Sequence, residues 1–209
     1  MVSDHLSFIC IVGRAYSGKD TAADYIVAQY NKHRERYAIK IALADLLKTV
    51  CRELIKMFYG INIPVAEFYD QEAKDRIRYD MPNFCGKPFT LRAVLQQVGT
   101  EIFRNYLWET IWCEYVEKLF VARSNYKIIV ISDIRRQDEL DYFAKFEHVT
   151  SICIKRDKAY IATSHDSEAN IEQIKVKHEV ANIGTIPELY AQLEEIIRKD
   201  ADIEHTFIG

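Results

Sequence analysis

Residues 13–21, Gly-Arg-Ala-Tyr-Ser-Gly-Lys-Asp-Thr, have the types and the spacing that phosphate binding requires. Gly13 and Gly18 permit a tight turn in which several backbone N–H groups point inward as a nest for phosphate oxygens. The loop follows an apolar run at 8–12 and opens a helical pattern. The helix N-terminus therefore adds partial positive charge, and Lys19 can reach the β- and γ-phosphates. This strand–loop–helix order predicts a P-loop that binds the phosphates of a nucleotide.

One position of this loop departs from the usual pattern. The residue after the lysine is normally a hydroxyl residue that binds Mg²⁺, but here it is Asp20, followed by Thr21. Asp20 can hold Mg²⁺ directly or through water while Thr21 contacts a phosphate. Equally, Asp20 can be a carboxylate that only stabilises the first turn of the helix. Both interpretations stay open, and Asp20 and Thr21 are the candidate metal ligands.

A second group of chemically suited residues follows the apolar run at 127–132. Asp133 follows this run, and Arg135 and Arg136 come after one intervening isoleucine. An apolar strand that ends in Asp is typical of a second carboxylate site beside a P-loop. Arginine suits phosphate because its guanidinium donates in a fixed fork. We therefore predict functional roles for Asp133 and Arg135, against the alternative of an ordinary helix entry with solvated charges.

The elements that must position these residues alternate between strand and helix. Short apolar, β-branched runs occur at 8–12, 37–42, 127–132 and 149–155, with a weaker one at 179–182. Such runs are typical of strands buried on both faces of a parallel sheet. Helical patterns occur at 21–29, 45–58, 90–103, 108–121 and 187–198. The alternation predicts an α/β fold: a mostly parallel five-stranded sheet between helical layers.

Two segments do not fit this alternation. Residues 60–88 are rich in charged and aromatic residues and predict an insert on the side of the substrate. Residues 155–169 are a polar excursion between the last two strands, and long excursions of this kind are usually functional. We expect one domain, with a core at 6–59, 89–155 and 176–200, an insert at 60–88 and a short lid at 156–170.

Composition excludes several classes of protein. The chain has 209 residues, of which 49% are hydrophobic and 28% charged, so it can bury one sizeable core and is not a disordered or low-complexity chain. A net charge of −3 without a basic stripe disfavours nucleic-acid binding. The sequence has no stretch of 18 apolar residues, so we expect no membrane span. Its five widely spaced cysteines disfavour a disulfide framework. We expect a cytoplasmic protein; apolar residues at 108–121 leave a homodimer possible.

Together these features resemble the phage- and large-virus-type deoxynucleoside monophosphate kinases, a branch of the P-loop kinases. The resemblance extends over about residues 7–198 and is weakest at 60–88. Beyond the loop, it is carried by four further motifs. They are Ala-Asp-Leu-Leu-Lys at 44–48, the Arg-x-x-x-Gln-x-x-Gly-Thr-Glu pattern at 92–101 with the later Trp112, Asp-x-Arg-x-x-x-Glu at 133–139, and Asn-x-Gly-Thr at 182–185.

The resemblance implies a P-loop kinase fold and ATP-dependent phosphorylation of a deoxynucleoside 5′-monophosphate, with Mg²⁺. By position it assigns the ATP phosphates and metal to Gly13, Ser17, Gly18, Lys19, Asp20 and Thr21. It assigns the acceptor site to Lys48, Arg92, Gln96, Thr100 and Trp112. Asp133 and Arg135 would serve the acceptor or the transferring group, Arg156 and residues 165–168 a lid, and Asn182 the adenine. Relatives carry a basic residue just before Ser-Gly-Lys, and Arg14 or Arg104 would replace it here.

Residue types give partial support to this assignment. In an α-helix Arg92, Gln96 and Thr100 share one face, which is unusually polar for a packing face. Trp112 is most economically a core residue, and only the resemblance suggests that it stacks on a base. Two alternatives remain: a P-loop kinase for another small acceptor, such as phosphomevalonate or dephospho-coenzyme A, and a nucleotide-binding module without catalysis.

Overall fold

The computed structural model describes residues 6–84, 86, 88–121, 125–156 and 171–200. The chain divides into two compact units, unit 1 within residues 1–43 and 113–209 and unit 2 at residues 44–112. The predicted insert at 60–88 belongs to unit 2, which extends well beyond it on both sides. The central residues of the predicted lid, 157–170, lie outside the described residues.

Unit 1 contains a five-stranded sheet. Its strands are β1 (Ser7–Val12), β2 (Ala38–Ile41), β3 (Ile128–Ile134), β4 (His148–Lys155) and β5 (His178–Ala181). They lie in the order β2-β3-β1-β4-β5, and all neighbouring strands are parallel. The five predicted strands and the α/β class are confirmed.

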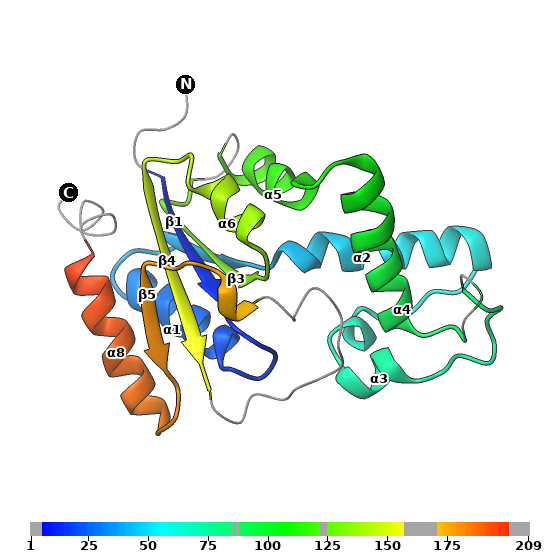
Figure 1. Ribbon diagram of the computed structural model, residues 1–209, viewed down its shortest axis with the longest axis horizontal. Coiled ribbons are helices and arrows are strands. Elements are labelled where there is room, and N and C mark those ends of the chain that lie inside the picture. Colours follow the sequence, from blue (N-terminus) through cyan, green and yellow to red (C-terminus); the bar gives the residue numbers. More distant parts are fainter. Residues whose placement is uncertain (1–5, 85, 87, 122–124, 157–170, 201–209) are drawn as a thin grey trace. The chain divides into compact units, whose positions relative to one another are not determined.

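Both faces of this sheet are covered by helices (Figure 1). Side chains alternate along a strand, and Ile9 and Ile11 pack with buried residues of α1 (Lys19–Asn31) and α8 (Ile186–Lys199). Phe8 points the other way, with its ring centroid 5.1 Å from that of Phe143 in α6 (Gln137–Phe143). The sheet is therefore the middle of three layers.

The helices of unit 1 begin at recognisable sequence signals. At the start of α8, Thr185 and Glu188 form a capping box, and a proline occupies the first turn. Helix α6, which the strand–helix alternation did not predict, begins after Arg136, with Glu139 as the acceptor of its capping interactions. A short 3₁₀-helix, η4 (Ile171–Gln173), precedes β5.

Unit 2 is helical and has a core of its own. It contains α2 (Leu43–Tyr59), η1 (Val65–Phe68), α3 (Gln71–Asp75), α4 (Leu91–Gln96) and the π-helix η2 (Gln97–Leu107). Asp70 caps α3 and Thr90 caps α4, each accepting a hydrogen bond from a backbone N–H three residues later. The core consists of buried residues from α2, η1, α4, η2 and the segments between them, among them Cys51, Phe68, Phe89, Leu91 and Val98.

The predicted helices at 90–103 and 108–121 differ from the observed ones. The first is α4 continued by η2 as far as Leu107. The second begins only at Ile111, as α5 (Ile111–Val116) followed by η3 (Glu117–Val121). Trp108 lies between them in an extended conformation, with φ −162° and ψ 149°. In the described part of the chain, no helix combines the length and hydrophobicity that crossing a membrane requires.

Candidate active site

The loop after β1 contains two glycines with positive φ, as the predicted phosphate-binding loop requires. Gly13 has φ +156° and Gly18 has φ +99°. Residues other than glycine rarely adopt either backbone conformation. A Cβ on Gly13 would lie 2.6 Å from Ser17 Oγ and 2.7 Å from the Ile154 carbonyl oxygen. A Cβ on Gly18 would lie 2.5 Å from the side-chain nitrogen of Asn182. Both glycines are thus required by conformation and by space.

Two side chains of the loop, those of Lys19 and Ser17, carry donors that are suited to a phosphate. Lys19 is the first residue of α1, and its Nζ donates a hydrogen bond of 2.6 Å to the carbonyl oxygen of Arg14 in the same loop. Ser17 is 1% exposed, and its Oγ has no hydrogen-bond partner among the described residues. A buried hydroxyl without a partner is costly. The loop, the orphaned hydroxyl and the start of a 13-residue helix therefore fit a phosphate chain.

Asp20, the candidate metal ligand, is exposed at the start of α1. Its carboxylate lies 3.8 Å from the ammonium of Lys40 in β2, and Lys40 pairs more closely, at 2.6 Å, with Asp24 one turn further along. Within the described residues, no group of three or more His, Cys, Asp or Glu side chains is arranged to hold a metal ion.

The ends of β4 and β5 contact the loop from the side. Asn182 donates a hydrogen bond of 2.8 Å to the carbonyl oxygen of Ser17, and Arg156 donates one of 3.4 Å to that of Tyr16. Tyr16 itself has φ +61°. The structure thus brings both predicted ATP-side residues to the phosphate loop. The rest of the predicted lid, including His165 and Glu168, lies outside the described residues.

Asp133 and Arg135 lie at the end of β3, the strand next to β1. The pairing of β1 with β3 shifts register between Cys10 and Val12, and such an irregularity changes the direction of the side chains that follow. Asp133 Oδ1 accepts a hydrogen bond of 2.6 Å from the backbone N–H of Leu43, just beyond β2. The carboxylate therefore ties the ends of two strands together at the carboxyl edge of the sheet, where α/β proteins bind ligands.

Glu139 is a contributor to this edge that we did not single out from the sequence. It is 2% exposed, and its Oε2 accepts hydrogen bonds from the backbone N–H groups of Arg135 at 2.8 Å and Arg136 at 3.2 Å. The side chain of Arg136 pairs with Asp138 at 2.7 Å. The last position of the Asp-x-Arg-x-x-x-Glu motif was the available signal: a buried glutamate that holds the turn carrying Arg135.

In unit 2, Arg92 and Lys48 are both paired with carboxylates. Arg92, in the first turn of α4, binds both carboxylate oxygens of Asp75 and donates a hydrogen bond of 2.9 Å to Gln71. The hydrogen bond from Arg92 holds the pKa of the Asp75 carboxyl below its ordinary value. Lys48 lies 2.9 Å from Asp45 and 3.7 Å from the centre of the Tyr69 ring. The segment η1–α3 therefore contacts Arg92 and Lys48, the two cationic side chains predicted for the acceptor site.

Gln96, Thr100 and Arg104 continue along the same helix and are half-buried. The change from α4 to the π-helix η2 occurs after Gln96. A π-helix is wider per turn than an α-helix, so residues four to five apart lie one above the other. The polar stripe predicted for Arg92, Gln96 and Thr100 consequently extends to Arg104. In an uninterrupted α-helix, Arg104 would turn away from it. Such π segments are frequent at functional sites.

Trp112 is packed inside the protein rather than displayed. It is 4% exposed, its ring centroid lies 5.1 Å from that of Phe103, and its Nε1 lies 3.5 Å from the carbonyl oxygen of Gly99. A Cβ on Gly99 would come within 2.5 Å of Leu47, so this glycine permits close approach of η2 to α2. In this structure the indole packs against Phe103 and Gly99 of η2. Base stacking by Trp112 stays a prediction.

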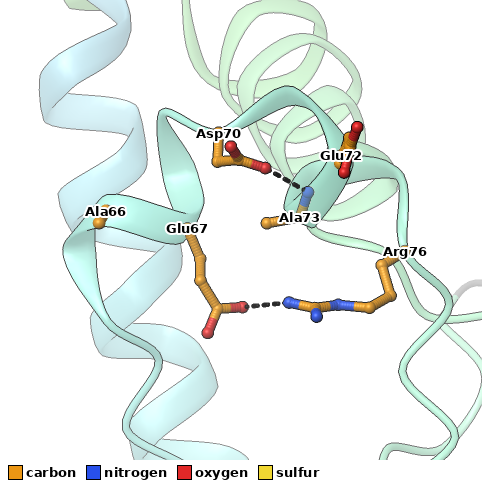
Figure 2. A pocket seen from close by; sticks show the side chains of 6 residues that line it. All are labelled: Ala66, Glu67, Asp70, Glu72, Ala73 and Arg76. Carbon is orange, nitrogen blue, oxygen red and sulfur yellow. Dashed lines mark hydrogen bonds and ion pairs between the residues drawn. The ribbon is translucent and has the colours of Figure 1, made fainter.

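A pocket of about 520 Å³ in unit 2 lies beside α3 and is lined by Ala66, Glu67, Asp70, Glu72, Ala73 and Arg76 (Figure 2). Its polar groups are engaged locally: Glu67 pairs with Arg76 at 3.3 Å, and Asp70 caps α3. None of the predicted acceptor residues lines this pocket, so we assign it no catalytic role.

Cysteine chemistry is not supported at this site. Among the described residues, Cys10, Cys51, Cys113 and Cys153 are buried and form no disulfide bond. Burial raises the pKa of the Cys51 thiol to about 12 and also raises the pKa of the Cys153 thiol. The thiols of Cys51 and Cys153 therefore stay protonated at neutral pH and are poor nucleophiles.

Comparison with known proteins identifies the family. A family model described as deoxynucleotide monophosphate kinase matches residues 61–193, and a protein of Acanthamoeba polyphaga mimivirus named for the same activity is 29% identical over 88% of this chain and 93% of its own length. The deoxynucleotide monophosphate kinase of Escherichia phage RB69 is 22% identical over 92% of this chain and all of its own length. The deoxynucleoside-5′-monophosphate kinase of phage T5 is 29% identical over 44% of this chain and 38% of its own length. With its phosphate loop and this match over more than half its length, the chain belongs to the deoxynucleotide monophosphate kinase family of phosphotransferases.

Proposed function

We propose that this protein transfers the γ-phosphoryl group of ATP to the phosphate of a deoxynucleoside 5′-monophosphate, which yields ADP and the deoxynucleoside diphosphate. The observation that carries the proposal is the loop with two positive-φ glycines, in which the buried Ser17 hydroxyl has no partner among the described residues and Lys19 stands at the end. The chain that contains this loop belongs to this kinase family.

On the donor side, the loop between Gly13 and Gly18 would bind the phosphate chain through its backbone N–H groups. Lys19 would exchange the Arg14 carbonyl oxygen for β- and γ-phosphate oxygens, and Ser17 Oγ would gain a partner. Asn182, at the end of β5, and Arg156, at the end of β4, would serve ATP from the positions in which they already hydrogen-bond to the loop.

Mg²⁺ would neutralise the charge that develops on the transferred group. Thr21, at the third position of α1, and Asp20 are the side chains of the loop that would hold it, Asp20 directly or through water. Lys40 would then be left with Asp24, its closer partner in the present structure.

On the acceptor side, Arg92 and Lys48 would bind the phosphate of the monophosphate. Both already bind carboxylate oxygens, and a phosphate offers the same kind of acceptor with a larger charge. These ion pairs are partly exposed and are worth only about 0–1 kcal/mol each, so a phosphate can replace them at small cost. Gln96, Thr100 and Arg104 would supply polar contacts to the sugar or base.

Transfer itself asks for positioning and positive charge rather than a protein nucleophile. The acceptor phosphate oxygen is already ionised at neutral pH, so no general base has to remove a proton. Arg135, held by Glu139 at the carboxyl edge of the sheet, would stabilise charge on the moving group. Asp133 would organise the same edge through Leu43 and contact the acceptor or Mg²⁺.

Release of ADP from ATP and Mg²⁺, measured against a panel of deoxy- and ribonucleoside monophosphates, tests this function. We expect turnover with at least one deoxynucleotide, and a loss of at least about a hundredfold in Lys19→Ala. The panel also contains phosphomevalonate and dephospho-coenzyme A. Turnover of either of these in place of every nucleotide would reject a nucleotide acceptor. ATP binding without turnover of any acceptor would reject catalysis.

A further inference from the structure

An ion pair connects the phosphate loop to the segment that precedes β5. Arg14 is the second residue of the loop, and its Nη2 lies 3.0 Å from the Oε1 of Glu172. Glu172 belongs to η4, which is anchored by the neighbouring Ile171, only 2% exposed. Glu172 is absent from the sequence motifs of the site. It is distant from Arg14 in the sequence, and the tertiary structure brings its carboxylate to the loop.

The guanidinium of Arg14 retains an unused donor. Its Nε is buried and has no hydrogen-bond partner among the described residues. A buried N–H without an acceptor is unfavourable, and its presence indicates an acceptor that binds there. The carbonyl oxygen of Arg14 accepts the hydrogen bond from Lys19 Nζ. The buried donor therefore belongs to the same residue that orients the lysine of the loop.

Arg14 is also the only basic residue between Gly13 and Gly18. A loop that binds a triphosphate benefits from a second cation, because phosphoryl transfer spreads negative charge over the equatorial oxygens. Arginine has many rotamers, and a free Arg14 would have to lose that freedom at each turnover. A carboxylate that holds one end of the guanidinium removes much of this cost before ATP binds.

We propose that Glu172 is a positioning residue: it holds Arg14 so that the guanidinium donates to a phosphate oxygen of ATP bound in the loop. This inference rests on the proposed function and deepens it. Arg14 touches the substrate, whereas Glu172 acts only through Arg14. The competing explanation is an ordinary surface ion pair, since the Glu172 side chain is 68% exposed.

A double-mutant cycle separates these explanations. We expect Glu172→Ala to lower kcat about tenfold, with the KM for the monophosphate unchanged within about twofold, since the lost alignment matters most in the transition state. Arg14→Ala should lower kcat at least as much. Adding Glu172→Ala to Arg14→Ala should have no further effect. Glu172→Gln keeps an oxygen acceptor for Nη2 and should restore most of the activity.

Glu179→Ala is the matched control. Glu179 lies in the same unit, is similarly exposed at 60%, and pairs with Lys155 at 2.6 Å. We expect its kcat to equal that of the wild type.

Three results would overturn the positioning role: wild-type kcat in Glu172→Ala, an equal loss when Glu172→Ala is added to Arg14→Ala, or an equal loss in Glu179→Ala. Should Glu172→Ala fail to fold, as judged by thermal unfolding, the same cycle with Glu172→Leu, which keeps much of the side-chain volume but offers no acceptor to Arg14, decides: coupling to Arg14 supports the role, and independence rejects it. A wild-type protein that phosphorylates no monophosphate would instead reject the proposed function.

Discussion

Asn182 and Ser17 are 165 residues apart in the chain, yet the side-chain amide of Asn182 donates a hydrogen bond of 2.8 Å to the Ser17 carbonyl oxygen. Ser17 lies between the two strained glycines, so this bond holds the curved part of the phosphate loop from the end of β5. The backbone of Asn182 is itself fixed, since its N–H donates to the carbonyl oxygen of Lys155 at 2.7 Å. The pairing of β4 with β5 therefore positions Asn182, and Asn182 in turn holds the loop.

Removing this bond should loosen the loop. We expect Asn182→Asp, which lacks the amide donor and places a carboxylate beside a carbonyl oxygen, to raise the Kd for ATP about tenfold or more. Asn182→Ala should have a smaller effect, consistent with loss of about 0.5–1.5 kcal/mol for one hydrogen bond. ATP titration by calorimetry checks both variants. Equal ATP affinity in Asn182→Asp and wild type would show that the bond does not shape the loop.

Gly18→Ala should be more harmful than its backbone conformation alone explains. The added Cβ combines the strain of φ +99° with a 2.5 Å approach to the Asn182 amide. The matched control is Gly60→Ala, where φ is +72° and no atom lies within 4 Å of the added Cβ. We expect Gly60→Ala to cost about 1 kcal/mol of unfolding free energy, and Gly18→Ala to cost more and to abolish ATP binding. Urea unfolding and ATP titration measure the difference; equal behaviour of the two variants would contradict the steric argument.

Arg92→Ala tests the acceptor side. Loss of a charged, bidentate donor should raise the KM for the monophosphate by at least about tenfold and leave the KM for ATP within about twofold. Arg76→Ala is the control: Arg76 lies in the same unit, pairs with Glu67 at 3.3 Å and is assigned no role in binding. Steady-state kinetics with one substrate varied at a time give both constants. If Arg92→Ala raised the KM for ATP instead, its place on the acceptor side would be wrong.

The ion pair between Asp75 and Arg92 should make a small contribution to stability that depends on pH. Because the hydrogen bond from Arg92 holds the folded pKa of Asp75 below its ordinary value of 3.8, the pair stabilises the protein above that value and loses its effect as pH falls through the lower, folded pKa. We therefore expect Asp75→Asn to lower the free energy of unfolding by less than about 1 kcal/mol at pH 7, and the difference from wild type to shrink as the pH falls through the folded pKa of Asp75. A difference that grows as the pH falls would contradict this sign.

Much of unit 1 could be predicted from local patterns. The five strands are short runs of β-branched and apolar residues, and burial on both faces of a parallel sheet leaves little choice of composition. The loop at 13–21 could also be predicted from the sequence, because two glycines followed by a lysine form a recognisable phosphate-binding pattern. The positive φ at 13 and 18 favours glycine at both positions. Parallel strands also imply that Asp133, Arg156 and Asn182 share one edge, because their carboxyl ends meet there.

Helical periodicity carried less information in unit 2. The residues at 90–103 predict a helix, but the change to a π-helix after Gln96 depends on how η2 packs, including the close approach of Gly99 to Leu47. Trp112 could be a core residue or a base-stacking one on sequence alone, and only its burial against Phe103 decided how it is placed.

The sequence by itself therefore determined the chemistry available to this protein, a glycine loop with a lysine, carboxylates and arginines at strand ends, and the α/β order that supports them. Only the tertiary structure decided which polar groups meet. It pairs Arg14 with Glu172 and Arg92 with Asp75, and it brings the amide of Asn182 to the carbonyl oxygen of Ser17. The physical reason is range. Backbone conformation and periodicity act over a few residues and leave local signals, whereas ion pairs and hydrogen bonds between distant segments depend on packing and leave none.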